Sequence, residues 1–401
     1  ILKELGHEVF VLAGDVETNR DMVANIENIT QISDLSIYQD CCLKEQSLAF
    51  KKDKVDATKL FSLVEYNTAA IMECIVEWSE ANEIELLIAE NTASIPSHIS
   101  LGFAIYSAVL ELDIPIICHH HDLAWDKGHR FVSSNKDINH FLKTIFPMQH
   151  DTATHITINT YAKTQFANKF DVDAYYIPDV VDFSQPFGER TDKSYELRHK
   201  LGLADTDIAL FQVTKIVRRK GIETAIELIK RIDDNAVKLV ITGTYTDDEK
   251  KNYYDELIKL VAELNLSDRV IFGYDIARNY DLSTIYGASD ICTYFSKYEG
   301  FGNTFIEAVH AKKPIFVNDY KPVFLQDIGI KGFITTMITD NEITDDAFNQ
   351  MLSIIYNPKL RKIIGEDNYK IGNKYFSYSV LKNKLKLIID KIEHEYYDDD
   401  E

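Results

Sequence analysis

The sequence predicts an α/β protein with mainly parallel sheets, divided into two domains. Short apolar runs alternate with helical apolar spacing along most of the 401 residues, a pattern typical of βα units. The alternation stops over a polar stretch, 182–194, that contains Pro186 and Gly188, and then starts again. We expect this stretch to be the linker between the domains. A chain of this length commonly forms about two domains. We therefore expect an N-terminal domain over 1–187 and a C-terminal domain over 195–375.

Each predicted strand is a short apolar run. In the first domain the runs are 9–13, 85–89, 114–118, 155–159 and 174–177, and helical spacing over about 64–81 joins the first two. In the second domain the runs are 208–213, 238–242, 269–272, 291–295 and 315–317. A helix over about 376–392 follows and is expected to pack back on the first domain. The charge run 393–401 is expected to be a disordered acidic tail.

The strongest functional signal is a glycine turn at the end of a predicted strand. Residues 298–308 read YEGFGNTFIEA, so Glu299 and Glu307 flank a Gly-Phe-Gly turn that leads into a helix. Free backbone N–H groups and the positive end of the helix dipole favour an anion there. Glycines let a phosphate approach the backbone closely. An alternative is a capping box over 304–307, in which Glu307 only reaches back to the helix start.

Two further segments follow predicted strands. Residues 211–221, FQVTKIVRRKG, place four cations where a helix begins, and these would neutralise a diphosphate. The alternative is a solvated basic patch. Residues 114–125, IPIICHHHDLAW, end a strand in three histidines, and strand alternation sends His119 and His121 to one side and His120 to the other. A zinc site is open as an alternative. Because neighbouring strand histidines do not easily share one ion, we expect no metal and a core position for His120.

These motifs resemble the retaining glycosyltransferases of family four. The E-x7-E motif of that family matches Glu299 to Glu307 within the segment IYGASDICTYFSKYEGFGNTFIEAVHAKKPIFV. The family's Arg-x4-Lys-Gly pattern matches at Lys220, but Lys215 stands at the Arg position and loses the two-pronged donor geometry. The segments IELLIAENTASIPSHISLGFAI and PIFVNDYKPVFLQDIGIKGF resemble a soluble branch that includes enzymes like mannosylglucosylglycerate synthase, which glycosylate small polar acceptors.

The resemblance implies the GT-B fold, in which two Rossmann-like domains face a central cleft. The opening ILKELGHEVFVLAG resembles the end of the first helix and the second strand, so the N-terminal domain is expected to lack its first strand and glycine loop. The implied catalytic residues are His121 and Glu299. The implied nucleotide-sugar contacts are Lys215, Lys220, Gly300, Phe301, Gly302, Asn303, Thr304 and Glu307. The implied acceptor contacts are Glu90, Asn91, Asp122, Trp125 and Arg130, with Asn91 alternatively a turn residue.

The function that follows is transfer of a hexose from a nucleotide diphosphate sugar, GDP- or UDP-hexose, to a small polar acceptor with retention of configuration. Cations and dipoles would carry the leaving-group charge, so neither a metal nor another cofactor is expected. The alternative is a degenerate GT-B protein that binds a nucleotide sugar without transferring it.

The composition of the chain argues against several classes of binding partner. The net charge of −21 argues against a nucleic-acid partner. Residues 1–187 contain 13 Lys or Arg against 28 Asp or Glu, a balance that anionic lipid would repel. The sequence has no apolar run near the roughly 20 residues needed to cross a bilayer, so no stable membrane insertion is expected. Five scattered cysteines suit a reduced, cytoplasmic protein. The sequence indicates no oligomeric state.

Overall fold

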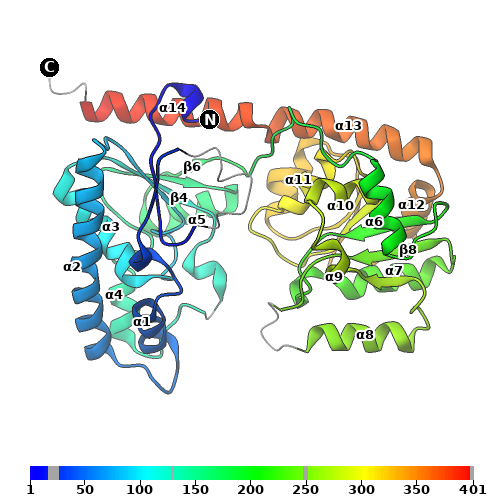
Figure 1. The fold of residues 1–401 in the computed structure, drawn as a ribbon, viewed down its shortest axis with the longest axis horizontal. Coiled ribbons are helices and arrows are strands. Elements are labelled where there is room, and N and C mark those ends of the chain that lie inside the picture. Colours follow the sequence, from blue (N-terminus) through cyan, green and yellow to red (C-terminus); the bar gives the residue numbers. More distant parts are fainter. Residues whose placement is uncertain (17–26, 129, 247–251, 398–401) are drawn as a thin grey trace. The chain divides into compact units, whose positions relative to one another are not determined.

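The computed structural model describes residues 1–16, 27–128, 130–246 and 252–397, and the chain divides into two compact units (Figure 1). The first unit contains Ile1–Ile177 and Lys382–Glu401, and the second contains Pro178–Leu381. Among the described residues, every pairing between named strands is parallel. Both units are therefore α/β, as the alternation predicted. None of the described helices combines the length and apolarity needed to cross a bilayer.

The first unit has a four-stranded sheet and a separate two-stranded sheet. The larger sheet has the order β3 (Leu87–Glu90), β4 (Ile116–His120), β5 (Ala153–Thr157) and β6 (Tyr175–Tyr176), and the smaller pairs β1 (Val11–Ala13) with β2 (Ile29–Gln31). The helices are α1 (Asp40–Phe50), α2 (Ala57–Ala81), α3 (Ile99–Leu112), α4 (Lys136–Leu142), α5 (Thr160–Phe170) and, late in the chain, α14 (Tyr378–Tyr397).

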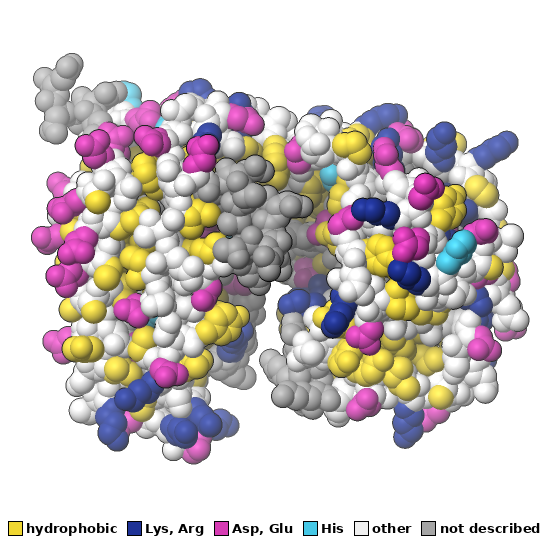
Figure 2. Space-filling view, in the orientation of Figure 1, with side chains coloured by type: hydrophobic (Ala, Val, Ile, Leu, Met, Phe, Trp, Pro, Cys, Tyr) yellow, Lys and Arg dark blue, Asp and Glu magenta, His cyan; other side chains and the backbone are white. Residues whose placement is uncertain are grey.

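Helix α2 shows how sequence spacing becomes packing in the first unit. The carboxylate of Asp56 accepts a hydrogen bond from the backbone N–H of Lys59 at 3.0 Å, which caps the helix start. Its buried residues recur at helical spacing and pack on α3; they are Leu60, Val64, Ile71 and Ile75. On the face drawn in Figure 2, acidic side chains are scattered over the first unit, in keeping with the acidic balance of residues 1–187.

The second unit has one six-stranded sheet covered on both faces. Its order is β12 (Thr336–Ile338), β11 (Ile315–Asn318), β10 (Ile291–Tyr294), β7 (Ile208–Gln212), β8 (Val237–Ile241) and β9 (Val270–Phe272). Leu210 and Leu239 belong to one apolar core, whereas Phe211 and Val240 belong to another. Because successive strand residues face opposite sides, these two cores mark the two faces of a buried parallel sheet.

Helices supply the other half of each core in the second unit. They are α6 (Asp192–Lys200), α7 (Ile222–Ile232), α8 (Tyr253–Glu263), α9 (Tyr274–Ala277), α10 (Leu282–Ala288), α11 (Asn303–His310), α12 (Asp345–Ile355) and α13 (Pro358–Phe376). The apolar residues whose spacing predicted α7 are all buried: Ile222, Ala225, Ile226, Leu228 and Ile229. Helix α7 is thus held by its packed face.

Two stretches at the domain boundaries differ from expectation. The polar stretch 182–194 is integrated into the second unit, because the Arg190 guanidinium lies 2.7 Å from the Asp290 carboxylate and donates to Ala288 O at 2.9 Å. The expected tail was wrong for residues 393–397, which continue α14, while 398–401 lie outside the described residues. Helix α14 contacts the first unit through Lys384 Nζ, which donates to Tyr176 O at 2.7 Å.

Candidate functional site

The backbone of Lys220 is fixed where β7 and β10 end. Gln212 Nε2 donates to Lys220 O at 2.8 Å, and Gln212 Oε1 accepts from Thr293 Oγ1 at 3.2 Å. Gly221 follows with φ of 60°, and a Cβ there would lie 2.1 Å from Phe295 O. Only glycine fits this position. The glycine of the Lys-Gly pair is therefore required for steric reasons.

Glu299 forms ion pairs with two cationic side chains of the second unit. Lys220 Nζ contacts Glu299 Oε1, and Arg219 Nη1 lies 2.6 Å from Glu299 Oε2. Arg219 also donates to Tyr298 O at 3.2 Å. The Glu299 side chain is only 9% exposed. Burial by itself would raise its pKa, but the charges of Lys220 and Arg219 outweigh burial and lower the pKa, so Glu299 is ionised.

For Lys220, burial outweighs the neighbouring carboxylate. Burial lowers the pKa of the Lys220 ammonium, and the attraction of Glu299 offsets this effect only in part. Glu307 also acts on this charge, although more weakly. The two carboxylates of the E-x7-E motif are thus both coupled to one buried lysine.

Glu307 is held by a tyrosine. Its Oε2 accepts a hydrogen bond from the Tyr286 hydroxyl at 2.8 Å, and burial raises the pKa of Glu307 above its ordinary value. The capping-box alternative is wrong, because the N-cap of α11 is Gly302 and Thr304 lies inside the helix. Glu307 therefore does not cap α11, and Tyr286 is its hydrogen-bond partner.

The glycine turn before α11 packs closely against Tyr320. Gly302 has φ of 121°, and a Cβ there would lie 2.2 Å from the Tyr320 hydroxyl oxygen. The N-cap Gly302 has no side chain that could accept hydrogen bonds from the first-turn N–H groups. A helix start of this kind favours an anion. The Tyr320 hydroxyl is buried and has no hydrogen-bond partner within the described ranges.

The sequence prediction missed Arg219 and Tyr286. The family pattern pointed to Lys215 as the second cation, but Lys215 is exposed and Arg219 is the residue that reaches Glu299. The run Arg218-Arg219-Lys220 was a visible signal, because it puts two further cations next to the lysine in the sequence. Nothing in the spacing connected Tyr286 with Glu307.

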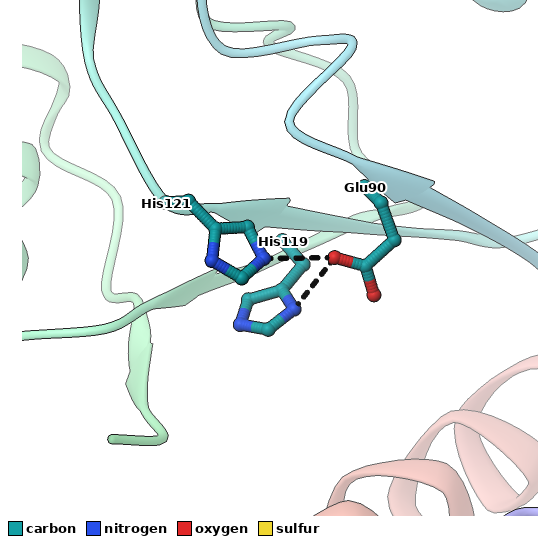
Figure 3. A group of neighbouring side chains, drawn as sticks. All are labelled: Glu90, His119 and His121. Carbon is teal, nitrogen blue, oxygen red and sulfur yellow. Dashed lines mark hydrogen bonds and ion pairs between the residues drawn. The ribbon is translucent and has the colours of Figure 1, made fainter. Parts of the chain in front are cut away.

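In the first unit, Glu90, His119 and His121 point toward one another at the ends of β3 and β4 (Figure 3). Glu90 Oε2 lies 3.0 Å from His119 Nδ1 and 3.0 Å from His121 Nε2. Partial desolvation by its neighbours would raise the pKa of Glu90, whose side chain is still 61% exposed, but hydrogen bonds from both histidines outweigh this effect and lower the pKa to about 2. The expectation that His119 and His121 share one side is confirmed. His119 Nε2 is buried and has no hydrogen-bond partner among the residues described.

His120 takes the core position expected for it. Its Nδ1 lies 2.6 Å from Ser94 Oγ and its Nε2 lies 3.0 Å from His155 Nδ1. Burial lowers the pKa of His120 well below its ordinary value, with a smaller contribution from the charge of His155. Burial also lowers the pKa of His155 to about 4. Both rings are therefore neutral at pH 7.

The remaining predicted acceptor residues lie in different surroundings. Asn91 has φ of 59°, and its Oδ1 accepts from the backbone N–H groups of His121 at 3.2 Å and Asp122 at 3.0 Å. It therefore has the turn role that was its alternative. Trp125 packs on α5, with its ring centroid 5.7 Å from that of Phe170. Arg130 is exposed, 5.1 Å from the Phe131 ring.

The chain is similar to known proteins. Residues 194–371 match the family model described as Glycosyl transferases group 1. Mannosylglucosylglycerate synthase of Thermotoga maritima is 25% identical over 423 residues, which cover 96% of this chain and 93% of that protein. The enzyme of the same name from Petrotoga mobilis is 30% identical over 276 residues, 63% of this chain and 64% of that protein.

Solved structures share the fold. A glycosyltransferase from Rickettsia africae superposes with a TM-score of 0.69 at 14% identity, over 98% of this chain and 91% of its own. Anabaena HepE, solved in complex with UDP and glucose, has a TM-score of 0.59 at 16% identity, over 88% of this chain and 95% of its own. The fold is therefore GT-B, residues 194–371 match the glycosyl transferases group 1 family, and almost the whole chain is similar to a mannosylglucosylglycerate synthase.

Proposed function

We propose that this protein is a glycosyltransferase that moves a hexose from UDP- or GDP-hexose to a small polar acceptor with retention of configuration. The observation that carries the proposal is the buried Glu299, held by Lys220 and Arg219 beside the glycine turn and the start of α11. A carboxylate for sugar hydroxyls, two cations and a helix dipole for phosphate are the groups that a nucleotide sugar needs.

The proposed reaction follows from those charges. The bond between the anomeric carbon and the diphosphate breaks, and the acceptor oxygen bonds to that carbon on the same face. The acceptor proton passes to a donor phosphate oxygen, so the diphosphate leaves with its charge partly neutralised. Lys220, Arg219 and the turn at Gly302 would stabilise the developing negative charge. Glu307 would hold the ribose.

This charge balance needs no metal at the diphosphate. Donor binding should therefore persist in excess chelator, and its loss there would contradict the proposal.

The five cysteines are unpaired, which supports the proposed cytoplasmic location.

The names of the two relatives make a mannosyl donor and a glucosylglycerate acceptor the first pair to test. The experiment incubates the full chain with UDP-, GDP- and ADP-hexoses and that acceptor. Mass spectrometry then identifies the product, and NMR assigns its anomeric configuration. An inverted anomer would contradict the proposed mechanism.

A second function, nucleotide-sugar binding without transfer, is favoured by one observation. Lys215 replaces the arginine of the family pattern and is exposed. Donor binding that yields neither a glycosylated product nor hydrolysis would support this second function.

A further inference from the structure

We propose that Glu90, His119 and His121 bind one first-row transition-metal ion such as Zn²⁺. The three side chains come from adjacent strands and converge on one point (Figure 3). Their ligand atoms all lie within 4.8 Å of one another. This inference does not rest on the proposed transfer reaction, because metal binding is measured without donor or acceptor.

The distances from the carboxylate to the two histidines fit a coordination sphere. Glu90 Oε2 lies 3.0 Å from a nitrogen of each histidine. Ligands bonded to an ion at about 2.1 Å are separated by roughly 3.0 Å in an octahedron and roughly 3.4 Å in a tetrahedron. An ion can therefore replace the two hydrogen bonds once side-chain rotation brings the two imidazole nitrogens, now within 4.8 Å, to such a separation.

The backbone holds these ligands before any ion arrives. Glu90 and His119 are register partners in the parallel pair of β3 and β4. The Asn91 N–H donates to His119 O at 2.9 Å, and Asn91 Oδ1 accepts from the His121 N–H at 3.2 Å. Ligands fixed in this way lose little freedom when a metal binds.

The ligand chemistry selects the class of ion. Two imidazoles and one carboxylate suit Zn²⁺, Co²⁺, Ni²⁺ or Fe²⁺, whereas Mg²⁺ and Ca²⁺ prefer oxygen ligands. Three protein ligands leave positions open for water or for an oxygen of a bound molecule. The His121 and Glu90 side chains are 41% and 61% exposed, so an ion has access. Two imidazoles that only donate hydrogen bonds to the carboxylate would show the same distances. The experiment must therefore distinguish a metal site from a hydrogen-bonded cluster.

The test measures Zn²⁺ binding to the full chain by calorimetry after chelator treatment and removal of the chelator. We expect one equivalent of Zn²⁺ per chain and no binding of Mg²⁺ at the same concentration. Both His119→Ala and Glu90→Gln should weaken Zn²⁺ binding at least tenfold. Gln keeps a hydrogen-bond acceptor at position 90, so it preserves the local structure if the alanine variant does not fold.

His199→Ala is the matched control, because His199 Nε2 also lies 3.0 Å from a carboxylate, that of Asp205. Among the described residues, this pair belongs to no group of three possible metal ligands. This variant should bind Zn²⁺ like the unmodified chain. Co²⁺ should give visible d–d absorption that Zn²⁺ abolishes and that Glu90→Gln lacks. No Zn²⁺ binding, or equal affinity in both ligand variants and the unmodified chain, would overturn the proposal and leave a hydrogen-bonded cluster only.

Discussion

Lys220 and Glu299 form a buried ion pair that joins the loop after β7 to the loop after β10. The Lys220 side chain is 10% exposed and that of Glu299 is 9% exposed. Removing one member of a buried pair leaves the other charge uncompensated. The pair therefore gives the site its shape and also places one carboxylate and one ammonium beside the glycine turn.

Glu299→Gln should lower turnover more than nucleotide affinity. Contacts to the sugar tighten as the glycosidic bond breaks, whereas contacts to the nucleotide change little. We expect kcat to fall on the order of a hundredfold. Stability should also fall by about 1 to 3 kcal/mol, because Lys220 loses its ionised partner. Steady-state kinetics and calorimetry with UDP or GDP measure the two effects, and equal losses in kcat and nucleotide affinity would contradict the assignment.

Glu307→Ala should mainly weaken nucleotide binding. Hydrogen bonds to a charged group contribute about 1.5 to 3 kcal/mol, so affinity should fall tenfold or more. Tyr286→Phe is the control, since it removes the hydroxyl that donates to Glu307 and keeps the carboxylate. Calorimetry with UDP and GDP compares the two variants. If Glu307→Ala changes only the melting temperature, Glu307 is structural.

Arg219→Ala should reduce turnover far more than Lys215→Ala. Arg219 lies 2.6 Å from Glu299 and can neutralise a diphosphate at the same place, whereas Lys215 is exposed. We expect at least a tenfold loss of kcat/KM for Arg219→Ala and less than threefold for Lys215→Ala. The reverse order would show that the family pattern, and not the ion pair, identifies the working cation.

Much of the fold was predictable because its central strands, such as β10 and β11, are buried. All ten predicted strands are present within about two residues at most ends, since a parallel sheet covered on both faces leaves continuous apolar runs in the sequence. The strands that were missed, β2 and β12, have three residues each and little apolar signal. Local periodicity carries no information on such short pairings.

The site was predictable where backbone geometry dictated residue type. Gly221 and Gly302 follow from positive φ and close approach, so the motifs around them could be found in the sequence. Arg219 and Tyr286 could be placed only by tertiary contacts with Glu299 and Glu307. The same limit applies to the cluster of Glu90 and His119, because sequence alternation gave the side of the strand but not the distance to the next strand.

The first unit should lose stability below about pH 6.5. His120 and His155 are neutral in the folded protein, because burial lowers the pKa of both, while the unfolded chain binds their protons near the ordinary value. The unfolded state therefore binds more protons as the pH falls, so the stabilisation present above pH 6.5 is lost toward pH 4. Each histidine contributes a slope of up to about 1.4 kcal/mol per pH unit.

Tryptophan fluorescence can follow this loss in the first unit alone, because both tryptophans of the chain, Trp78 and Trp125, lie in Ile1–Ile177. His155→Leu removes one titrating ring and should reduce the slope of stability against pH between 6.5 and 5 by about half. The slope is the readout, since the absolute stability also changes when His120 loses its partner. His199→Ala, in the second unit, should leave the slope unchanged. A slope that His155→Leu does not alter would show that other groups control the acid sensitivity of the first unit.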